Sequence, residues 1–483
     1  MNYVLSIDQS TQSTKAILFD QEGSIVKRVD KAHQQHIDEH GYISHNPNEI
    51  YENTLQAIED VVSVCHIQYD DIKAIGISNQ RETTLMWDDK GNVYANAVVW
   101  QCARASDIAK RYLPYKEEIF HTTGLVLSPY FPACKMRWLL EHVKPEKPYY
   151  FGTMDTWLVY QLTDKKVYKT DASNASRTQL FDIHTGTWSK RLCELFAIDM
   201  HALPEVCDSN ACFGYTTLGG RSSTPIPIYA VMGDSHAALY GQTCHEEGSV
   251  KTTLGTGSSI MMNIGSTYKK SYNGLTTSLA WKIDGNMTYV FEGNINYAGA
   301  VISWLQYDLR LIDSPQDAME AALHSNPEDE TILIPAFSGL SAPYWKEDAC
   351  GMFYGMRRTT KRNELIKASL ESIAYQIADV LQAMSKDSGF TTMDVKIDGG
   401  PSKNTYLMQF LSDMANARVH ISAQEELSAI GVAYLAGIQA GVYQKETVFA
   451  QRLYTDYIPM MDENTWRVKM NRWHEAMHHL LGN

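Results

Sequence analysis

The chain has 483 residues, too many for one hydrophobic core, and this length predicts two large domains or three ordinary ones. With 44% apolar and 20% charged residues, it has the composition of a globular protein. Its net charge of −14 excludes a nucleic-acid partner held by phosphate neutralisation, and the lack of a long apolar run or a basic-then-apolar leader predicts a cytoplasmic protein with no membrane partner.

The first predicted element is a three-stranded meander over residues 3–7, 16–19 and 24–29. Between its first two strands, a turn of hydroxyl and amide side chains runs from Asp8 through Thr11 to Lys15. Hydroxyls and backbone N–H groups at a hairpin tip can hold a phosphate, and an Asp beside them can hold a hydrated Mg²⁺. Asp8, Thr11 and Lys15 are therefore a candidate magnesium–phosphate site, although a plain polar turn explains this hairpin alone equally well.

A helix is predicted next, because Asn46-Pro47-Asn48-Glu49 combines an N-cap, a first-turn proline and an N3 glutamate. Two strands follow, over 72–77 and 95–100. Arg81 and Glu82 come just after the first of these strands, where chemistry in open α/β sheets is located. We expect their side chains to diverge and to offer a donor fork and an acceptor, which suit a vicinal diol; a surface charge pair is the alternative.

Another apolar strand, over 225–233, ends at Asp234, and a helix is expected from Ser235. A carboxylate in this position can take a proton from a substrate hydroxyl while a phosphoryl group is transferred. The same residue is also a common helix N-cap, and the two interpretations are compatible.

The second half of the chain repeats the first motif. A hairpin over 250–262 turns at Gly255-Thr256-Gly257, and a strand over 395–397 ends at Asp398-Gly399-Gly400. Helices are predicted over 364–384, from 404 to 414, and over the Ala- and Gly-rich stretch 428–441. Two phosphate-binding hairpins predict one nucleotide held between two related lobes, 1–243 and 244–483. Neither is a Walker A loop, since no GxxxxGK[ST] occurs.

One competing motif indicates zinc. His474-Glu475-Ala-Met-His478 matches the HExxH pattern of zinc proteases, but it lies near the end of the chain on an amphipathic stripe. A terminal surface helix explains it more simply. The eight cysteines include no CxxC pair, which predicts reduced thiols rather than a zinc site.

Residues 130–141, Tyr-Phe-Pro-Ala-Cys-Lys-Met-Arg-Trp-Leu-Leu-Glu, and residues 351–371 resemble the two signatures of the FGGY carbohydrate kinase family. Segments 78–84, 170–178, 335–345 and 407–413 are similar to the glycerol kinases within it. The resemblance runs nearly end to end. It implies an α/β fold of two actin-like (ribonuclease H-like) lobes with an inter-lobe active-site cleft, and we expect a homodimer or larger homo-oligomer.

The resemblance also assigns roles to individual residues, with ATP and Mg²⁺ as cofactors. It implies that the acceptor contacts Arg81, Glu82, Trp100, Tyr130 and Asp234, with Asp234 as the base and Ser235 and Ser259 lining the pocket. It implies that ATP contacts Thr11, Gln12, Lys15, Thr256, Gly299, Ser303, Gly400 and Asn404. It places Asp8 and Asp234 near Mg²⁺.

Several residues depart from the glycerol kinase pattern. Ser235-His236 stand in place of Gln-Gln, and Ser259 stands in place of an aromatic residue that packs on the glycerol carbons. Both changes predict a wider and more polar pocket. We therefore expect phosphorylation of a small polyol by ATP, first of all of glycerol to glycerol 3-phosphate. A kinase for a tetritol, pentitol or pentulose is the alternative, and an actin-like ATPase without a sugar site is a more distant one.

Overall fold

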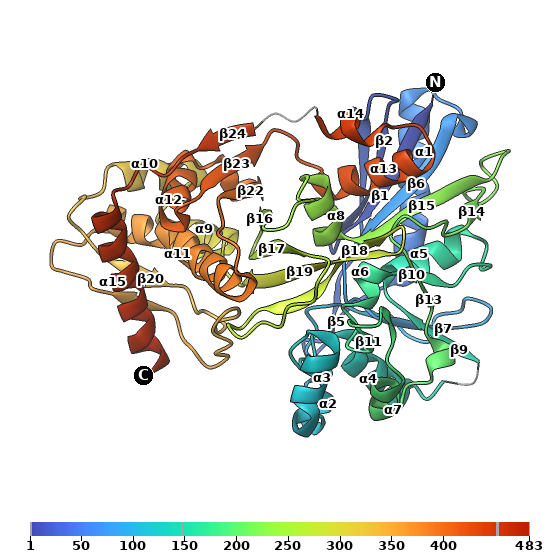
Figure 1. Ribbon diagram of the computed structural model, residues 1–483, viewed down its shortest axis with the longest axis horizontal. Helices are drawn as coiled ribbons and strands as arrows, with labels where there is room; N and C mark the ends of the chain where they lie inside the picture. Colours follow the sequence, from blue (N-terminus) through green and yellow to red (C-terminus); the bar gives the residue numbers. More distant parts are fainter. Residues whose placement is uncertain (1, 146–147, 451–453, 483) are drawn as a thin grey trace.

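Two mixed β-sheets, one in each half of the chain, form the framework of the protein (Figure 1). The computed structural model describes residues 2–145, 148–450 and 454–482. The first sheet has the strand order β14-β15-β6-β1-β2-β3. Its strands are β1 (Tyr3–Gln9), β2 (Ser13–Phe19), β3 (Ile25–Ala32), β6 (Ile72–Asn79), β14 (Tyr215–Thr216) and β15 (Ile226–Gly233).

The second sheet has the order β18-β19-β17-β16-β22-β23-β24. Its strands are β16 (Val250–Leu254), β17 (Ser258–Gly265), β18 (Thr276–Ile283), β19 (Asn286–Ile295), β22 (Asp394–Gly399), β23 (Arg418–Ser422) and β24 (Tyr454–Tyr457). In both sheets an antiparallel hairpin, β1–β2 or β16–β17, is followed on the side of its first strand by two parallel strands. This shared pattern confirms the predicted duplication and the α/β fold class.

The chain also forms α-helices, some of which pack on the two main sheets and some on one another or on the smaller strands. They are α1 (Pro47–Cys65), α2 (Ser106–Arg111), α3 (Lys116–Thr123), α4 (Pro132–Val143), α5 (Met154–Leu162), α6 (Ala172–Ala175), α7 (Lys190–Phe196), α8 (Asp234–Gly241), α9 (Gly299–Ser303), α10 (Pro315–Leu323), α11 (Arg362–Ser388), α12 (Thr405–Ala415), α13 (Leu427–Gln439), α14 (Lys445–Ala450) and α15 (Glu463–Leu481). As predicted, α1 begins after Asn46, whose side chain accepts a hydrogen bond from the Asn48 backbone N–H. Each lobe encloses its own hydrophobic core.

Short strands complete the structure: β4 (His36–Ile37), β5 (Ile43–His45), β7 (Leu85–Asp88), β8 (Ala97–Val98), β9 (Tyr149–Gly152), β10 (Lys169–Asp171), β11 (Phe181–Asp182), β12 (Thr187–Trp188), β13 (Glu205–Cys207), β20 (Ile332–Ile334) and β21 (Met352–Tyr354). The strand predicted over 95–100 is therefore reduced to β8, which pairs with β5 outside the main sheet. Trp100 lies in the turn that follows it.

The helix α13 belongs to the second half of the sequence but packs against the first sheet, beside α8 (Figure 1). Small residues permit this contact. A Cβ atom on Gly431 would lie 2.0 Å from the Ala237 carbonyl oxygen, and one on Gly76 would lie 2.4 Å from the Val432 carbonyl oxygen. Glycine at these two positions lets the helix backbones and the sheet approach closely. The division at residue 243 stays a prediction, because the chain returns to the first lobe after it.

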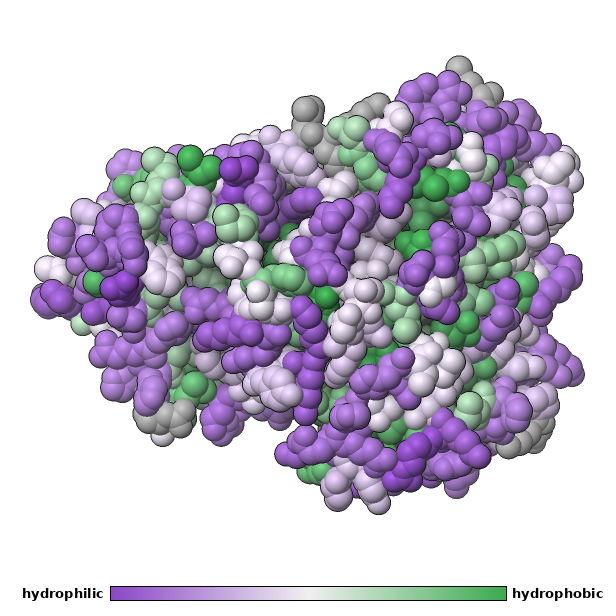
Figure 2. Space-filling view, in the orientation of Figure 1, coloured by the Kyte–Doolittle hydropathy of each residue, from purple (hydrophilic) through white to green (hydrophobic). Residues whose placement is uncertain are grey.

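Hydrophilic residues cover most of the face in Figure 2, with hydrophobic ones in small scattered groups. None of the described helices combines the length and apolar character needed to cross a membrane.

Candidate active site

A cavity of about 900 Å³ opens where the ends of strands from both sheets meet. The β1–β2 turn, the end of β6, the start of α8 and the β16–β17 turn all contribute to its wall. The cavity therefore gathers residues that are up to 286 positions apart in the chain, from Ser10 to Asn296. The predicted site residues that line it are Thr11, Gln12, Lys15, Arg81, Glu82, Trp100, Tyr130, Asp234, Thr256 and Ser259.

A second cavity, of about 400 Å³, lies on the second lobe and brings together Gly299, Ser303, Gly400 and Asn404. Its other lining residues include Ile302, Tyr307, Met319 and Pro401. The two cavities meet at the tip of the β16–β17 hairpin, because the Gly299 N–H donates to the Gly255 carbonyl at 2.9 Å and the Ala300 N–H donates to Thr256. An apolar and aromatic pocket beside a glycine-rich tip suits a planar base joined to phosphates.

Asp234 lies at the floor of the larger cavity as the first residue of α8. Its Oδ1 is 3.2 Å from Arg81 Nε and accepts a hydrogen bond from the Ser235 N–H at 2.6 Å. The side chain is 38% exposed, and its partial removal from bulk water raises the pKa of this carboxyl, although the Arg81 charge opposes the rise. The N-cap position is occupied by Gly233, so Asp234 is not the cap. Ser235 itself is not among the residues that line the cavity.

Arg81 and Glu82 have different partners, as predicted. Arg81 Nη1 donates to both carboxylate oxygens of Glu292, at 3.0 and 3.2 Å, whereas Glu82 Oε1 accepts from Arg177 Nε at 2.6 Å. The backbone of Glu82 adopts a left-handed conformation with φ of 60°. This conformation turns the chain, so that the side chains of Arg81 and Glu82 point to different partners. Arg81 and Glu82 are both buried, at 7% and 2% exposed, and both line the cavity.

Trp100 and Tyr130 also line the cavity, and their rings are in edge-to-face contact with centroids 5.6 Å apart. Trp100 Nε1 also donates to Thr11 Oγ1 at 2.9 Å. Trp100, a predicted acceptor-binding residue, is thus hydrogen-bonded to the first hairpin.

Asp8 lies beneath the cavity rather than in its lining, because it is part of β1 and is 3% exposed. Its carboxylate accepts from Ser78 Oγ at 2.8 Å and lies 3.3 Å from Lys15 Nζ. The described residues contain no group of three or more His, Cys, Asp or Glu side chains arranged to hold a metal ion. A donor set of one or two carboxylates is nevertheless what Mg²⁺ uses, since it keeps several of its own waters.

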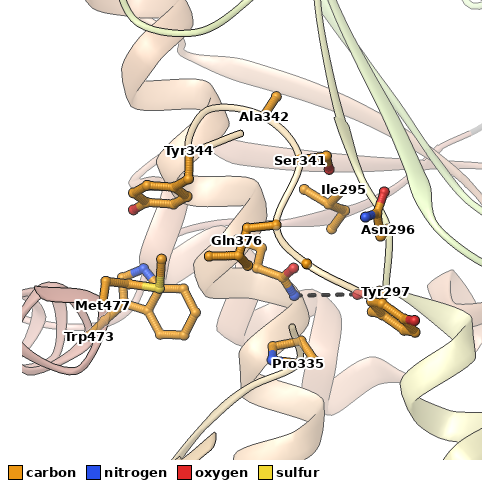
Figure 3. Close-up of a pocket in the computed structure, with 12 residues that line it drawn as sticks. Ile295, Asn296, Tyr297, Pro335, Ser341, Ala342, Tyr344, Gln376, Trp473 and Met477 are labelled. Carbon is orange, nitrogen blue, oxygen red and sulfur yellow. Dashed lines mark hydrogen bonds between the residues drawn. The ribbon is translucent and has the colours of Figure 1, made fainter. Parts of the chain in front are cut away.

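A third and much smaller cavity lies behind the wall of the first (Figure 3). Ile295 and Asn296 line both, and Gln376 Nε2 donates to the Tyr297 carbonyl at 3.3 Å. Its volume of about 10 Å³ is room for one water, so it is not a substrate pocket.

The HExxH sequence lies on α15, which packs beside this small cavity through Trp473 and Met477. Trp473 Nε1 donates to Asp379 Oδ2 at 2.6 Å, and His474 Nε2 is 2.8 Å from Asp379 Oδ1. The motif is explained by helix packing, as the sequence predicted.

The comparisons with known proteins agree with this geometry. The model of the N-terminal domain of the FGGY family of carbohydrate kinases matches residues 3–241, and that of the C-terminal domain matches residues 250–440. The chain belongs to the FGGY family of carbohydrate kinases. Its resemblance to the glycerol kinases extends over the full length, and the predicted two-lobed fold and kinase class are confirmed.

Two relatives illustrate the similarity. This FGGY kinase is 42% identical to glycerol kinase 1 of Thermotoga maritima, over 99% of both chains, and 39% identical to a glycerol kinase of Clostridium beijerinckii, over 98% of both. It superposes on the crystal structure of Plasmodium falciparum glycerol kinase with ADP with a TM-score of 0.94, at 33% identity, covering 100% of this chain and 98% of that one. A xylulose kinase from Lactobacillus acidophilus, 21% identical, shares the fold with a TM-score of 0.90 over 100% and 99% of the chains.

Three buried charged residues of this FGGY kinase are absent from the predicted site: Lys135, Arg177 and Glu292. Lys135 Nζ, on α4, donates to the carbonyls of Tyr130, Trp100 (3.1 Å) and Glu82 (3.5 Å), so one ammonium holds three wall residues. A charged residue within an apolar run is the sequence feature that could have revealed Glu292, which directly follows Val290 and Phe291.

Proposed function

We propose that this FGGY kinase transfers the γ-phosphoryl group of ATP to a hydroxyl of a small polyol, with glycerol as the first acceptor. The observation that carries the proposal is the convergence of Arg81, Glu82 and Asp234 on a cavity whose other walls are the two hairpin tips. Full-length identity of about 40% to glycerol kinases supports the same acceptor.

In this proposal Arg81 donates to one acceptor hydroxyl and Glu82 accepts from its neighbour, which fixes a vicinal diol in the cavity. Asp234 removes the proton of the attacking hydroxyl. The acceptor oxygen forms a bond to the γ-phosphorus, the bond to the β–γ bridging oxygen breaks, and ADP leaves. The raised pKa of Asp234 makes this residue a stronger base than an exposed carboxylate.

The hairpins receive the nucleotide. The backbone N–H groups around Thr11 and Thr256 and the Lys15 ammonium face the phosphates, while the cavity around Gly299 and Asn404 takes the base. Asp8 and Asp234 would hold Mg²⁺ through its waters, and the ion would neutralise charge on the transferred group. Closure of the two lobes would exclude water and limit hydrolysis of ATP.

The decisive experiment is an ATP-dependent kinase assay across polyols and ketoses, ranked by kcat/KM. Glycerol is expected to be phosphorylated. Hydrolysis of ATP without phosphorylation of any member of the panel would favour the actin-like ATPase instead. The predicted homo-oligomer and cytoplasmic location stay predictions, which sedimentation and cell fractionation would test.

A longer polyol is the second candidate, and one observation favours it. Ser259 on β17 lies directly opposite Asn294 on β19, and both line the cavity. Ser259 Oγ and Asn294 Oδ1 are buried, and neither has a hydrogen-bond partner among the described residues. A buried polar atom without a partner costs about 1–3 kcal/mol, which an additional acceptor hydroxyl would recover.

Ser259→Phe tests this second candidate. If the acceptor is longer than glycerol, the ring fills the extra space, and the KM for glycerol falls while kcat/KM for a tetritol or pentitol falls more than tenfold. Ser259→Ala is the matched control, because it removes the hydroxyl without filling the space. If the ratio of kcat/KM for glycerol to kcat/KM for the longer polyols is unchanged in both variants, the result would argue against a widened pocket.

Glu426 supports a further prediction about nucleotide affinity. Its carboxylate lies 2.9 Å from Lys15 Nζ and also pairs with Arg28, and both cations line the cavity. Glu426→Gln removes a negative charge that competes with the phosphates, so the Kd for ATP is expected to fall about two- to fivefold, as is usual for a partly exposed ion pair.

Glu118→Gln provides the control, because Glu118 pairs with the exposed Arg191 and neither residue lines either cavity. Titration calorimetry at low salt measures both variants. Weaker ATP binding by Glu426→Gln would show that this carboxylate positions Lys15 rather than competing for it.

A further inference from the structure

A series of ion pairs connects Asp234 and Glu82, two residues that line the acceptor cavity, through buried side chains. Asp234 contacts Arg81, Arg81 contacts Glu292, Glu292 contacts Arg177, and Arg177 contacts Glu82, over distances of 3.2, 3.0, 2.5 and 2.6 Å. We call this series the charge chain. Asp234 and Glu82 at its ends and Arg81 line the cavity, whereas Glu292 and Arg177 do not.

The two inner residues come from different lobes. Glu292 is part of β19 in the second sheet, and Arg177 follows α6 in the first half of the chain. Arg81 and Glu82 follow β6 of the first sheet. The second lobe therefore supplies the carboxylate on which two arginines of the first lobe converge.

Fold stability alone is a poor explanation for the charge chain. Glu292 and Arg177 are 1% and 2% exposed, and burial of such charges costs about as much as their attraction returns. Apolar residues of similar volume often stabilise a core better. What the charges provide is geometry, since the guanidinium fork fixes the position of its partners in a plane.

We propose that Glu292 and Arg177 are positioning residues for phosphoryl transfer: Glu292 orients the Arg81 fork, and Arg177 orients Glu82 toward the acceptor. The proposal rests on the proposed function of the cavity. It assigns to the second lobe a part in binding the acceptor as well as the nucleotide.

The test is Glu292→Gln, which keeps the shape and removes the charge, assayed with glycerol and ATP. We expect the acceptor KM to rise about 10- to 100-fold, the range for a lost hydrogen bond to a charged group, while the KM for ATP changes less than threefold. A purely structural role would not separate the two KM values in this way. Glu371→Gln is the matched control, since this buried glutamate pairs with Tyr406 away from the cavity.

Two conservative variants keep the proposal testable if Glu292→Gln does not fold. Glu292→Asp and Arg177→Lys retain the charges but change the geometry of the pairs, so both should raise mainly the acceptor KM, and by less than Glu292→Gln does. An unchanged acceptor KM, or equal losses for ATP and acceptor with a lower Tm, would overturn the proposal. If the wild-type protein phosphorylates no acceptor, the proposed function fails; activity in the wild type that Glu292→Gln leaves intact refutes the positioning role alone.

Discussion

Replacement of Asp234 with asparagine is expected to lower kcat about 100- to 10,000-fold, the range for loss of a general base. The asparagine amide keeps the shape of the side chain, and its oxygen can still accept the hydrogen bond from the Ser235 N–H. It cannot take the proton of the acceptor hydroxyl. Nucleotide binding should change little, because the cavity around Gly299 and Asn404, which we propose to bind the nucleotide base, is untouched.

A coupled assay for ADP release gives kcat, and calorimetry gives the Kd for ATP. Asp107→Asn, which makes the same chemical change at a fully exposed carboxylate, is the control. In the wild type, kcat should fall as the pH falls through the raised pKa of Asp234, because the protonated carboxyl is no longer a base. Wild-type turnover by Asp234→Asn would remove the base assignment.

Replacement of Lys135 with methionine is expected to raise the acceptor KM about 10- to 100-fold, because main-chain carbonyls lose a charged donor. Lys135 is completely buried, and its partners are the carbonyls of Tyr130, Trp100 and Glu82, three of the residues proposed to contact the acceptor. Lys396→Met is the control: its ammonium also donates to main-chain carbonyls, at Gln242 and Thr243, and its loss should lower Tm without a comparable change in the acceptor KM.

Lys135 also predicts opposite pH trends for activity and stability. Burial lowers the pKa of Lys135 from 10.5 to about 7, although Glu82 opposes this shift. Cys102, Cys134 and Arg104 act on it as well. Between pH 7 and 10.5 the unfolded chain binds this proton more tightly than the folded one, so the contribution of Lys135 to the free energy of unfolding rises with pH.

Activity should move the other way, because the neutral amine has one N–H fewer for the three carbonyls and kcat/KM should fall above about pH 7. Measurements of kcat/KM and Tm across pH 6–9 separate the two trends. Lys135→Met should reduce the pH dependence of both kcat/KM and Tm. An alkaline loss of kcat/KM that persists in this variant would assign the titration to another group.

Local patterns in the sequence predict much of the fold. Alternating apolar runs, hydroxyl-rich turns and the cap at Asn46 give the two hairpins and α1, since these depend on neighbours within a few positions. The match between β1–β2 and β16–β17 was visible for the same reason, and so were the strand ends that carry Arg81 and Asp234. The shortened strand β8 was not, because its pairing with β5 depends on a contact more than 50 residues away.

The sequence alone thus determined two related α/β lobes, the position of Asp234 at the end of a strand and the membership of a carbohydrate kinase family. Only the tertiary structure decided that α13 packs against the first sheet, that Asp8 lies outside the lining of the cavity, and that Lys135, Arg177 and Glu292 contact residues proposed to bind the acceptor. The physical reason is distance along the chain. A buried charge is tolerated only where partners from remote segments meet it, and no local pattern specifies which segments those are.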